Sequence, residues 1–332
     1  MPEFRQNFVT KEWVIIAPER ARRPSDYRTR ESDNPARSAH DPACPFCPGN
    51  ENETGVEMLR YGTEYAWSLR VIRNKYSALD PAGAVLRRQE GLFLAAGNHG
   101  VAEVVIESPM HNLSFSSLPH EAAVDVLQSY RERSRDIGSM PDISMVIVFR
   151  NHGPGAGTSL SHPHSQIIAS PIIPPHLRDP IHLAALHLDS FGSCVYCDML
   201  AEELRQAHRI IEENEHFVSY CPFASRSPYE LRILPKRHAA SFTLITDAEI
   251  VSLAGILQHA TARIRDLLAD PSYNFVIRSS PISDEDVRYL HWYLVLIPKI
   301  TTPAGFEIGS GIYINPSSPE ACARHLRGEA VS

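Results

Sequence analysis

The sequence lacks several features that would decide its class at once. No apolar run approaches the ~20 residues that a membrane span needs, and the opening stretch MPEFRQNFVTKEWVII has no apolar core before a cleavage site. We therefore expect no membrane association, no signal peptide and a cytoplasmic protein. Positive charge is also not in excess. With 32 Lys and Arg against 39 Asp and Glu, the net charge is −7, which argues against a dedicated nucleic-acid binder.

What remains is a globular composition. Hydrophobic residues make up 43% and charged residues 21% of the chain, which excludes wholesale disorder. A length of 332 residues fits one large domain or two smaller ones. The segment 20–52 is rich in Arg, Pro, Ser and Asp without a sustained period, and we expect an irregular arm along the surface there.

Cysteines are few, but most of them are regularly spaced. Four of the six cysteines form the pairs Cys44-x2-Cys47 and Cys194-x2-Cys197, whereas Cys221 and Cys322 stand alone. In a cytoplasmic protein of this size such pairs indicate metal or redox chemistry more than structural disulfides. The two single cysteines are interpreted as small hydrophobic residues.

The hydrophobic pattern predicts the same order of elements in both halves of the chain. Strands are expected over 101–108, 143–151, 166–173, 231–236, 273–280 and 292–300, and helices over 118–137 and from the capping box Thr246-x-x-Glu249 onward. Each half begins with a Cys-x2-Cys pair and has a histidine just after a strand, in ESPMH and LPKRH. From His111 to His162 is 51 residues, and from His238 to His291 is 53 residues. We infer a duplicated α+β unit in which most strands are antiparallel and each helix covers one face of the sheet.

The repeated cysteines and histidines predict two metal sites. Zinc prefers four thiolate or imidazole ligands in a tetrahedron, and Cys2His2 is a standard set. The expected ligands are Cys44, Cys47, His111 and His162 for one ion and Cys194, Cys197, His238 and His291 for a second. A redox Cys-x2-Cys pair and hydrogen-bonded structural histidines are the alternatives. Repetition of the whole four-residue pattern favours two structural Zn²⁺ ions per chain.

The motif His162-Pro163-His164-Ser165-Gln166 is predicted to carry the chemistry. Residues two apart on a strand face the same side, so His164 and Gln166 project together beside His162. The preceding loop offers backbone N–H groups of glycines and the hydroxyls of Thr158 and Ser159, a composition typical of phosphate binding. A histidine fixed next to such a loop is suited to act as a nucleophile.

The second half lacks these groups. Aligning His162 with His291 places Tyr293 opposite His164 and Val295 opposite Gln166. The duplicated unit is therefore expected to have one working site and one pseudo-site.

The run RNHGPGAGTSLSHPHSQ resembles the signature of the galactose-1-phosphate uridylyltransferases, a branch of the histidine-triad superfamily. Further similarity lies in RARRP, CPFC, RNKYSAL, ESPMH and GFEIGSGIYINP, so that the resemblance covers nearly the whole chain. It implies two fused histidine-triad-like half-domains, 1–175 with the active site and 176–332 with the pseudo-site, and a homodimer. It also implies ping-pong transfer of a nucleoside monophosphate between a nucleoside diphosphate sugar and a sugar 1-phosphate.

The resemblance also assigns roles to single residues. It implies His164 as the nucleophile and Gln166 as a ligand of the α-phosphate oxygens. Other contacts to phosphate, nucleoside or sugar are implied for Asn151, Gly157, Ser159, Asn74 and Arg23.

Some positions depart from the best-known uridylyltransferases. Asn74-Lys75-Tyr76 stands where they have Asn-Asp-Phe, and the segment 305–313 lacks their lysine and glutamine. The GFEIGSG ending and the paired Cys2His2 sets look more like the related ADP-glucose phosphorylases, which leaves an enzyme with inorganic phosphate as acceptor as an alternative. Two other readings are a hydrolase of the superfamily, which would carry a third histidine where Gln166 stands, and a zinc-stabilised binding module.

Overall fold

One continuous antiparallel sheet of ten strands forms the centre of the molecule. The computed structural model describes residues 1–20 and 37–329. Every neighbouring pair of strands in this sheet runs antiparallel. In the order of the sheet, the strands are β10 (Ile210–Glu213), β11 (Phe217–Tyr220), β12 (Leu231–Pro235), β14 (Tyr293–Pro298), β13 (Tyr273–Arg278), β8 (Met145–His152), β9 (His164–Ser170), β7 (Val101–Ile106), β4 (Trp67–Arg73) and β3 (Glu57–Gly62).

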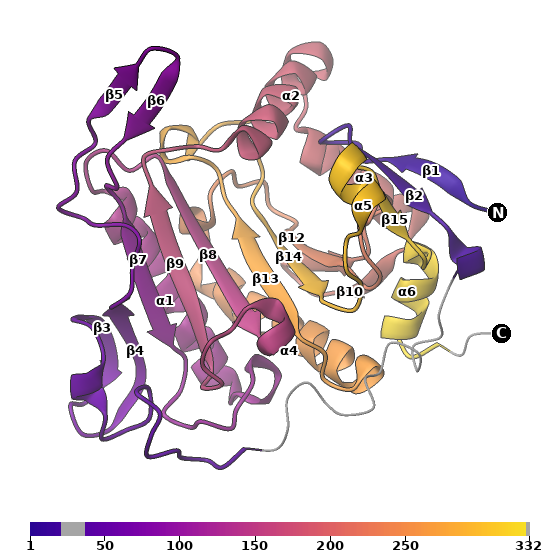
Figure 1. Cartoon of the computed structure of the whole chain (residues 1–332). Coiled ribbons are helices and arrows are strands. Elements are labelled where there is room, and N and C mark those ends of the chain that lie inside the picture. Colours follow the sequence, from indigo (N-terminus) through magenta and orange to yellow (C-terminus); the bar gives the residue numbers. More distant parts are fainter. Residues whose placement is uncertain (21–36, 330–332) are drawn as a thin grey trace.

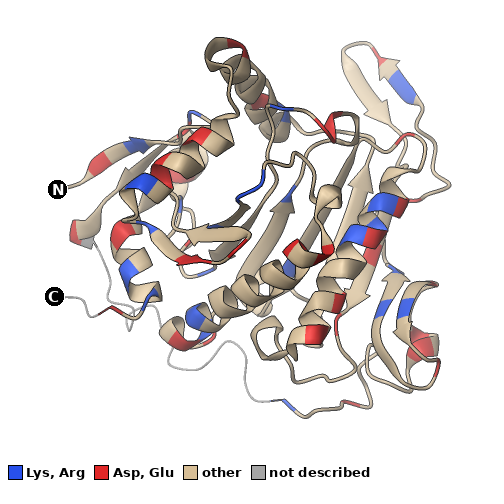
Figure 2. Cartoon of the chain, turned by 180° about the vertical axis from the view of Figure 1, so that it is seen from behind, with Lys and Arg blue, Asp and Glu red and all other residues tan. Residues whose placement is uncertain are grey.

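Two long helices cover one face of the sheet. They are α1 (His120–Gly138) and α4 (Asp247–Leu268), which lie side by side behind the strands (Figure 1). Figure 2 shows charged residues along the outer side of both helices, whereas Arg133 of α1 is buried and pairs with Glu103 of β7. The main core lies between, and residues such as Val126, Leu127, Leu253 and Leu257 are fully buried in it. The prediction of an α+β fold with mostly antiparallel strands is therefore confirmed.

The order of strands is the same when read inward from either edge. From one edge it is β3-β4-β7-β9-β8, and from the other it is β10-β11-β12-β14-β13. The two series meet where β8 pairs with β13, with Tyr273 opposite His152 and Ile277 opposite Val148. Residues before and after the expected boundary at 175 thus belong to one sheet.

Smaller elements surround the sheet. Over its other face lie, at the end of the later strands, α2 (Pro175–Phe191), α3 (Val195–Gln206) and a three-stranded sheet of β1 (Glu3–Gln6), β2 (Trp13–Ile16) and β15 (Tyr313–Asn315) (Figure 1). Other elements include the hairpin β5 (Arg87–Glu90) and β6 (Phe93–Ala96) and the short helices α5 (Gly305–Ser310) and α6 (Pro319–Leu326). The expected irregular arm has only turns over 37–50. Within residues 1–20 and 37–329, no helix combines the length and the apolar character of a membrane span.

The predicted capping box at the start of α4 is present. Thr246 is the N-cap, the Glu249 N–H donates to its hydroxyl at 3.2 Å, and the Glu249 carboxylate accepts the Thr246 N–H at 2.9 Å. Both bonds satisfy donors that the first turn of a helix otherwise leaves unpaired.

Because α4 supplies much of the core, loss of this cap lowers the stability of the whole fold. We expect Thr246→Ala to reduce the free energy of unfolding by about 1 kcal/mol in urea titration. The exposed Thr301 is the matched control, and Thr301→Ala should leave the unfolding midpoint unchanged. Equal midpoints for the two variants would contradict this role of the cap.

Candidate active site and Cys/His clusters

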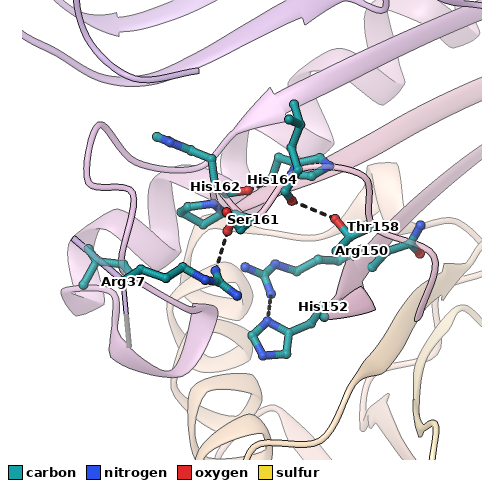
Figure 3. Close-up of a pocket in the computed structure, with 12 residues that line it drawn as sticks. Arg37, Arg150, His152, Thr158, Ser161, His162 and His164 are labelled. Carbon is teal, nitrogen blue, oxygen red and sulfur yellow. Dashed lines mark hydrogen bonds between the residues drawn. The ribbon is translucent and has the colours of Figure 1, made fainter. Parts of the chain in front are cut away.

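A small pocket opens where β8 ends and β9 begins. The connecting loop turns at Gly153 and Gly157, which have φ angles of 78° and 87° that side chains with a Cβ rarely adopt. The polar residues of the lining come from this loop, from the adjacent strand ends and from the segment before the first Cys pair. They are Arg37, Arg150, Asn151, His152, Thr158, Ser161, His162 and His164 (Figure 3).

The imidazole of His164 is held in one orientation. Its Nδ1 lies 2.7 Å from the carbonyl oxygen of His162, and a carbonyl only accepts, so Nδ1 carries the proton and Nε2 the lone pair. Phe46 contacts the ring edge-on, with the ring centroids 5.4 Å apart. Burial lowers the pKa of His164 below its ordinary value, so the imidazole is neutral near pH 7. A neutral, oriented imidazole with an available lone pair is the form in which histidine acts as a nucleophile.

A buried ion pair lies beside this histidine. The Arg150 guanidinium donates from Nε to both carboxylate oxygens of Glu107, at 2.9 and 3.1 Å, and both side chains are buried. The Glu107 backbone N–H donates to the carbonyl of Pro163, next to His164, at 3.2 Å. Arg150 also contacts His152, whose Nε2 lies 3.1 Å from an Asp270 carboxylate oxygen. These contacts connect the ends of β7, β8 and β9. They therefore restrict the movement of the start of β9, which carries His164.

The structure brings some of the predicted site residues into this pocket and leaves others outside its lining. Asn151 and Thr158 line it, Asn151 accepting from Asn274 Nδ2 at 2.7 Å and Thr158 donating to the carbonyl of Leu160 at 2.9 Å. Gln166 lies two residues along β9 from His164, partly exposed, beyond the lining.

The remaining predicted contacts lie farther out. Gly157 and Ser159 are exposed on the loop. Asn74 follows β4, where its side chain accepts the N–H of Tyr76 at 3.0 Å. Arg23 lies outside the described residues. Arg37, Arg150, His152 and Ser161 line the pocket although the sequence analysis assigned them no role. Arg150 and His152 flank Asn151 within the same sequence motif, and this position next to a predicted site residue could have identified them as pocket residues.

The first predicted metal set comes together beside the pocket. Cys47 Sγ lies 3.5 Å from Nδ1 of His111 and 3.6 Å from Nδ1 of His162, and Cys44 Sγ lies 3.8 Å from Nδ1 of His162. All four ligand atoms are within 4.8 Å of one another, and all four residues are buried. Typical zinc–sulfur and zinc–nitrogen bond lengths give a tetrahedron with edges of roughly 3.3–3.8 Å. These four residues can therefore hold a tetrahedral metal ion.

The other ring nitrogens fix the orientation of the two histidines. His162 Nε2 lies 2.8 Å from the carbonyl oxygen of Ser108, and His111 Nε2 lies 3.0 Å from the hydroxyl of Ser161. Each contact leaves Nδ1 as the nitrogen that faces the cysteines, as in metal sites where an outer partner sets the tautomer. Burial raises the pKa of the Cys44 thiol to about 11, so a bound cation is what would favour its thiolate.

The second set is gathered less tightly. The ligand atoms of Cys194, Cys197 and His238 lie within 4.8 Å of one another, and Cys197 Sγ is 3.3 Å from His238 Nδ1. His291 does not belong to that compact group, although its Nδ1 lies 3.8 Å from Cys197 Sγ. Hydrogen bonding to Cys197 lowers the pKa of Cys194 to about 6, which favours a thiolate there. This cluster can also hold a metal ion, with three compact ligands and the fourth nearby.

Comparison with sequence families gives two matches. Residues 1–174 match the model of the N-terminal domain of galactose-1-phosphate uridyl transferase. Residues 122–329 match a domain of unknown function, DUF4921.

Several characterised proteins are similar over the whole length. The chain is 37% identical to an ADP-glucose phosphorylase of Arabidopsis thaliana, with 98% of this chain and 92% of the relative covered. It is 30% identical to a galactose-1-phosphate uridylyltransferase of Thermotoga maritima, with 100% and 99% covered. Among solved structures, an Arabidopsis thaliana ADP-glucose phosphorylase with bound ADP-glucose matches with a TM-score of 0.84 at 34% identity, and both chains are covered completely.

The Glu107–Arg150 pair should be essential for stability, because a buried charge without its partner is costly. We expect Glu107→Gln to lower the free energy of unfolding by about 3–5 kcal/mol, measured by urea denaturation. Glu202→Gln breaks a similar Arg–Glu contact, to Arg205, at the surface and serves as the control. That variant should unfold like the wild type. A Glu107→Gln protein as stable as the Glu202→Gln control would show that the Glu107–Arg150 pair is not needed for stability.

Proposed function

The chain belongs to the galactose-1-phosphate uridylyltransferase family and is a nucleotidyltransferase, and on that premise we propose that it transfers a nucleoside monophosphate from a nucleoside diphosphate sugar through a covalent bond to His164. The observation that carries the proposal is the hydrogen bond from His164 Nδ1 to the carbonyl of His162, 2.7 Å long. It leaves Nε2 as the nucleophilic atom, beside a loop whose glycines allow close approach of phosphate.

In the first half-reaction, Nε2 of His164 attacks the α-phosphorus of the nucleotide sugar. A nitrogen–phosphorus bond forms, and the bond from that phosphorus to the bridging oxygen breaks, releasing a sugar 1-phosphate. The leaving group is a phosphate that needs no strong general acid at neutral pH. Charge on the phosphoryl oxygens would be met by Gln166, Ser159, Thr158 and backbone N–H groups around Gly157.

In the second half-reaction, an oxygen of a second phosphate attacks the nucleotidyl-histidine and takes over the nucleoside monophosphate. Imidazole suits this step because it leaves readily from a phosphoramidate. The bond from Nδ1 of His164 to the His162 carbonyl holds the ring in place while Nε2 is released. Asn74 and Arg23 are proposed to contact the nucleoside and the sugar-phosphate region, and Asn151 to orient the loop.

Two donor and acceptor pairs fit this chemistry. One is a UDP-hexose with a sugar 1-phosphate, as the name of the Thermotoga maritima relative indicates for that enzyme. The second is ADP-glucose with inorganic phosphate, and the higher identity to the Arabidopsis thaliana phosphorylase, 37% against 30%, favours it.

A hydrolase is less consistent with the site. Hydrolases of the histidine-triad type carry a third histidine two residues after the nucleophile, whereas Gln166 stands at that position. An amide does not supply the leaving group with a proton as an imidazolium does.

We propose that both Cys/His clusters hold structural zinc, the second with His291 as its fourth ligand. In the first cluster, His162 would then be a metal ligand whose own carbonyl orients His164. The ion supplies rigidity to this short stretch.

We also propose that the chain is a duplication of one histidine-triad-like unit, divided near residue 175. The matching strand series that meet at β8 and β13 support it. So does the position of the last histidine of each set, since His162 precedes β9 by two residues and His291 precedes β14 by two residues. A homodimer, implied by the family resemblance, and a cytoplasmic location, expected from the sequence, remain predictions.

The metal proposal predicts about two zinc ions per chain in the purified protein, measured by plasma mass spectrometry. Cys44→Ser and Cys194→Ser should each retain about one. Cys221→Ser is the control, since Cys221 is buried outside both clusters, and it should keep both ions. A wild-type protein with one ion or none would remove at least one assignment.

Intact-mass spectrometry tests the transfer reaction and names the base. Incubation with UDP-glucose, ADP-glucose or GDP-glucose should give one covalent nucleotide adduct, whose added mass identifies the nucleoside. Inorganic phosphate or a sugar 1-phosphate should then remove it, and the faster of the two is the natural type of acceptor. His164→Gly should give no adduct, while His208→Gly, a change at an exposed histidine, should behave like the wild type. An adduct on the His164→Gly protein would sink the covalent mechanism.

A further inference from the structure

The loop beside the pocket is supported by a segment from the second half of the chain. β8 ends at His152 and β9 begins at His164, so residues 153–163 form the loop between them, called the pocket loop below. It lies next to the start of β13 (Figure 1). Residues 270–274, which lead from the end of α4 into β13, contact this loop and the end of β8 through their side chains, as the next paragraphs describe.

Asn274 makes the central contact. Its side-chain amide donates from Nδ2 to the side-chain oxygen of Asn151 at 2.7 Å and to the carbonyl oxygen of Ala156 at 3.0 Å. A backbone carbonyl only accepts, so the second contact identifies the amide nitrogen as the atom that faces the loop. One side chain of β13 therefore holds both the end of β8 and the turn of the pocket loop.

The bond to Ala156 restrains more than one carbonyl group. That carbonyl belongs to the same planar peptide unit as the N–H of Gly157, which donates to the carbonyl of Pro154 at 3.1 Å. The peptide unit is thus held at its oxygen and at its nitrogen. Its orientation sets the direction in which the chain continues to Thr158 and Ser159, whose hydroxyls are proposed above to meet the charge of the phosphoryl oxygens.

Two neighbours of Asn274 add further contacts. The hydroxyl of Ser272 accepts the N–H of Gly155 at 3.0 Å, and a Cβ at Gly155 would lie only 3.1 Å from that hydroxyl, so the loop and the segment are in close contact. The Tyr273 ring stacks on His152 with the ring centroids 4.6 Å apart. Its hydroxyl lies 3.3 Å from the Arg150 guanidinium, which donates to it.

The two halves do not support each other equally. At the equivalent place on the other side of the β8–β13 pair, the loop after β13 meets the start of β8. Among the described residues, the contact there is one backbone hydrogen bond, from the N–H of Ile282 to the carbonyl of Ser144 at 2.9 Å. The side-chain bonds therefore run mainly from the second half to the loop beside His164.

We propose that Asn274, together with Ser272, is a positioning residue for the transfer reaction, which holds the pocket loop so that its phosphate-binding groups face His164. The inference rests on the proposed function, since the loop has a phosphate to meet only if the nucleotide sugar binds there. A misplacement of about 1 Å caused far from the reacting atoms can cost roughly 100-fold in rate. The half without a nucleophile would then contribute to catalysis by supporting the loop of the other half.

The rate of adduct formation in a single turnover tests this role. With ADP-glucose, or with UDP-glucose if only that donor reacts, Asn274→Ala should form the adduct about 10- to 100-fold more slowly than the wild type, with the same final mass. Ser272→Ala removes one bond to the loop and should slow the reaction by about 2- to 10-fold. The loss should appear in the maximal rate more than in the half-saturating concentration, because the loop groups act on charge that develops during transfer.

Gln258→Ala is the matched control. The Gln258 amide also joins the two halves through a backbone carbonyl, that of Leu118, at 2.8 Å, but neither residue lines the pocket. Asn274→Ala and Gln258→Ala should lose similar stability in urea titration, and only Asn274→Ala should lose rate. Equal rates of adduct formation in these two variants would rule out a positioning role for Asn274.

Hydrogen exchange of the loop separates this inference from the proposed function. Peptides that cover residues 153–159 should exchange faster in Asn274→Ala than in the wild type, and they should be unchanged in Gln258→Ala. Unchanged exchange in Asn274→Ala would show that its side chain does not hold the loop, even if the wild type is active. A wild-type protein that forms no adduct with any donor would instead refute the proposed function, and with it the role of Asn274 in transfer.

Discussion

The site depends on one short hydrogen bond, between Nδ1 of His164 and the carbonyl oxygen of His162. Donor and acceptor are only two residues apart, so the bond persists only if the backbone between them is fixed. Contacts of His162 and Pro163 with several other segments fix this backbone. His162 faces Cys44 and Cys47 with one ring nitrogen and the carbonyl of Ser108 with the other, and Pro163 accepts from the backbone of Glu107. The imidazole that we propose as the nucleophile is thus oriented by the backbone, and the backbone is held by a Cys/His cluster.

Much of this could be predicted from the sequence because it depends on local patterns. The strands at 101–108, 143–151 and 273–280 and the two long helices were predicted to within a few residues, since alternation and a capping box depend only on neighbours in the chain. The four residues of the first Cys/His cluster were also predicted together, because their types and the spacing repeated in the second half limit the choice. The position of His291 outside the compact second group could not be predicted, since spacing does not determine ångström-scale distances.

Other features could not be predicted from the sequence, for physical reasons. Helix α2 has prolines at its start and at Pro180 inside it, and such residues normally argue against a helix. The Glu107–Arg150 pair joins residues 43 positions apart through the burial of both, and no pattern along the chain indicates that.

The pairing of β8 with β13 has a consequence for synthesis of the protein on the ribosome. His152 ends β8, and its partner Tyr273 is about 120 residues later in the chain. At typical rates of translation, the N-terminal half therefore waits roughly 6–24 s with the edge of an apolar strand unpaired. Such an edge can pair with strands of other nascent chains. A joined sheet of this kind would place the greatest demand on chaperones during that interval, and slower translation between the two strands would lengthen it.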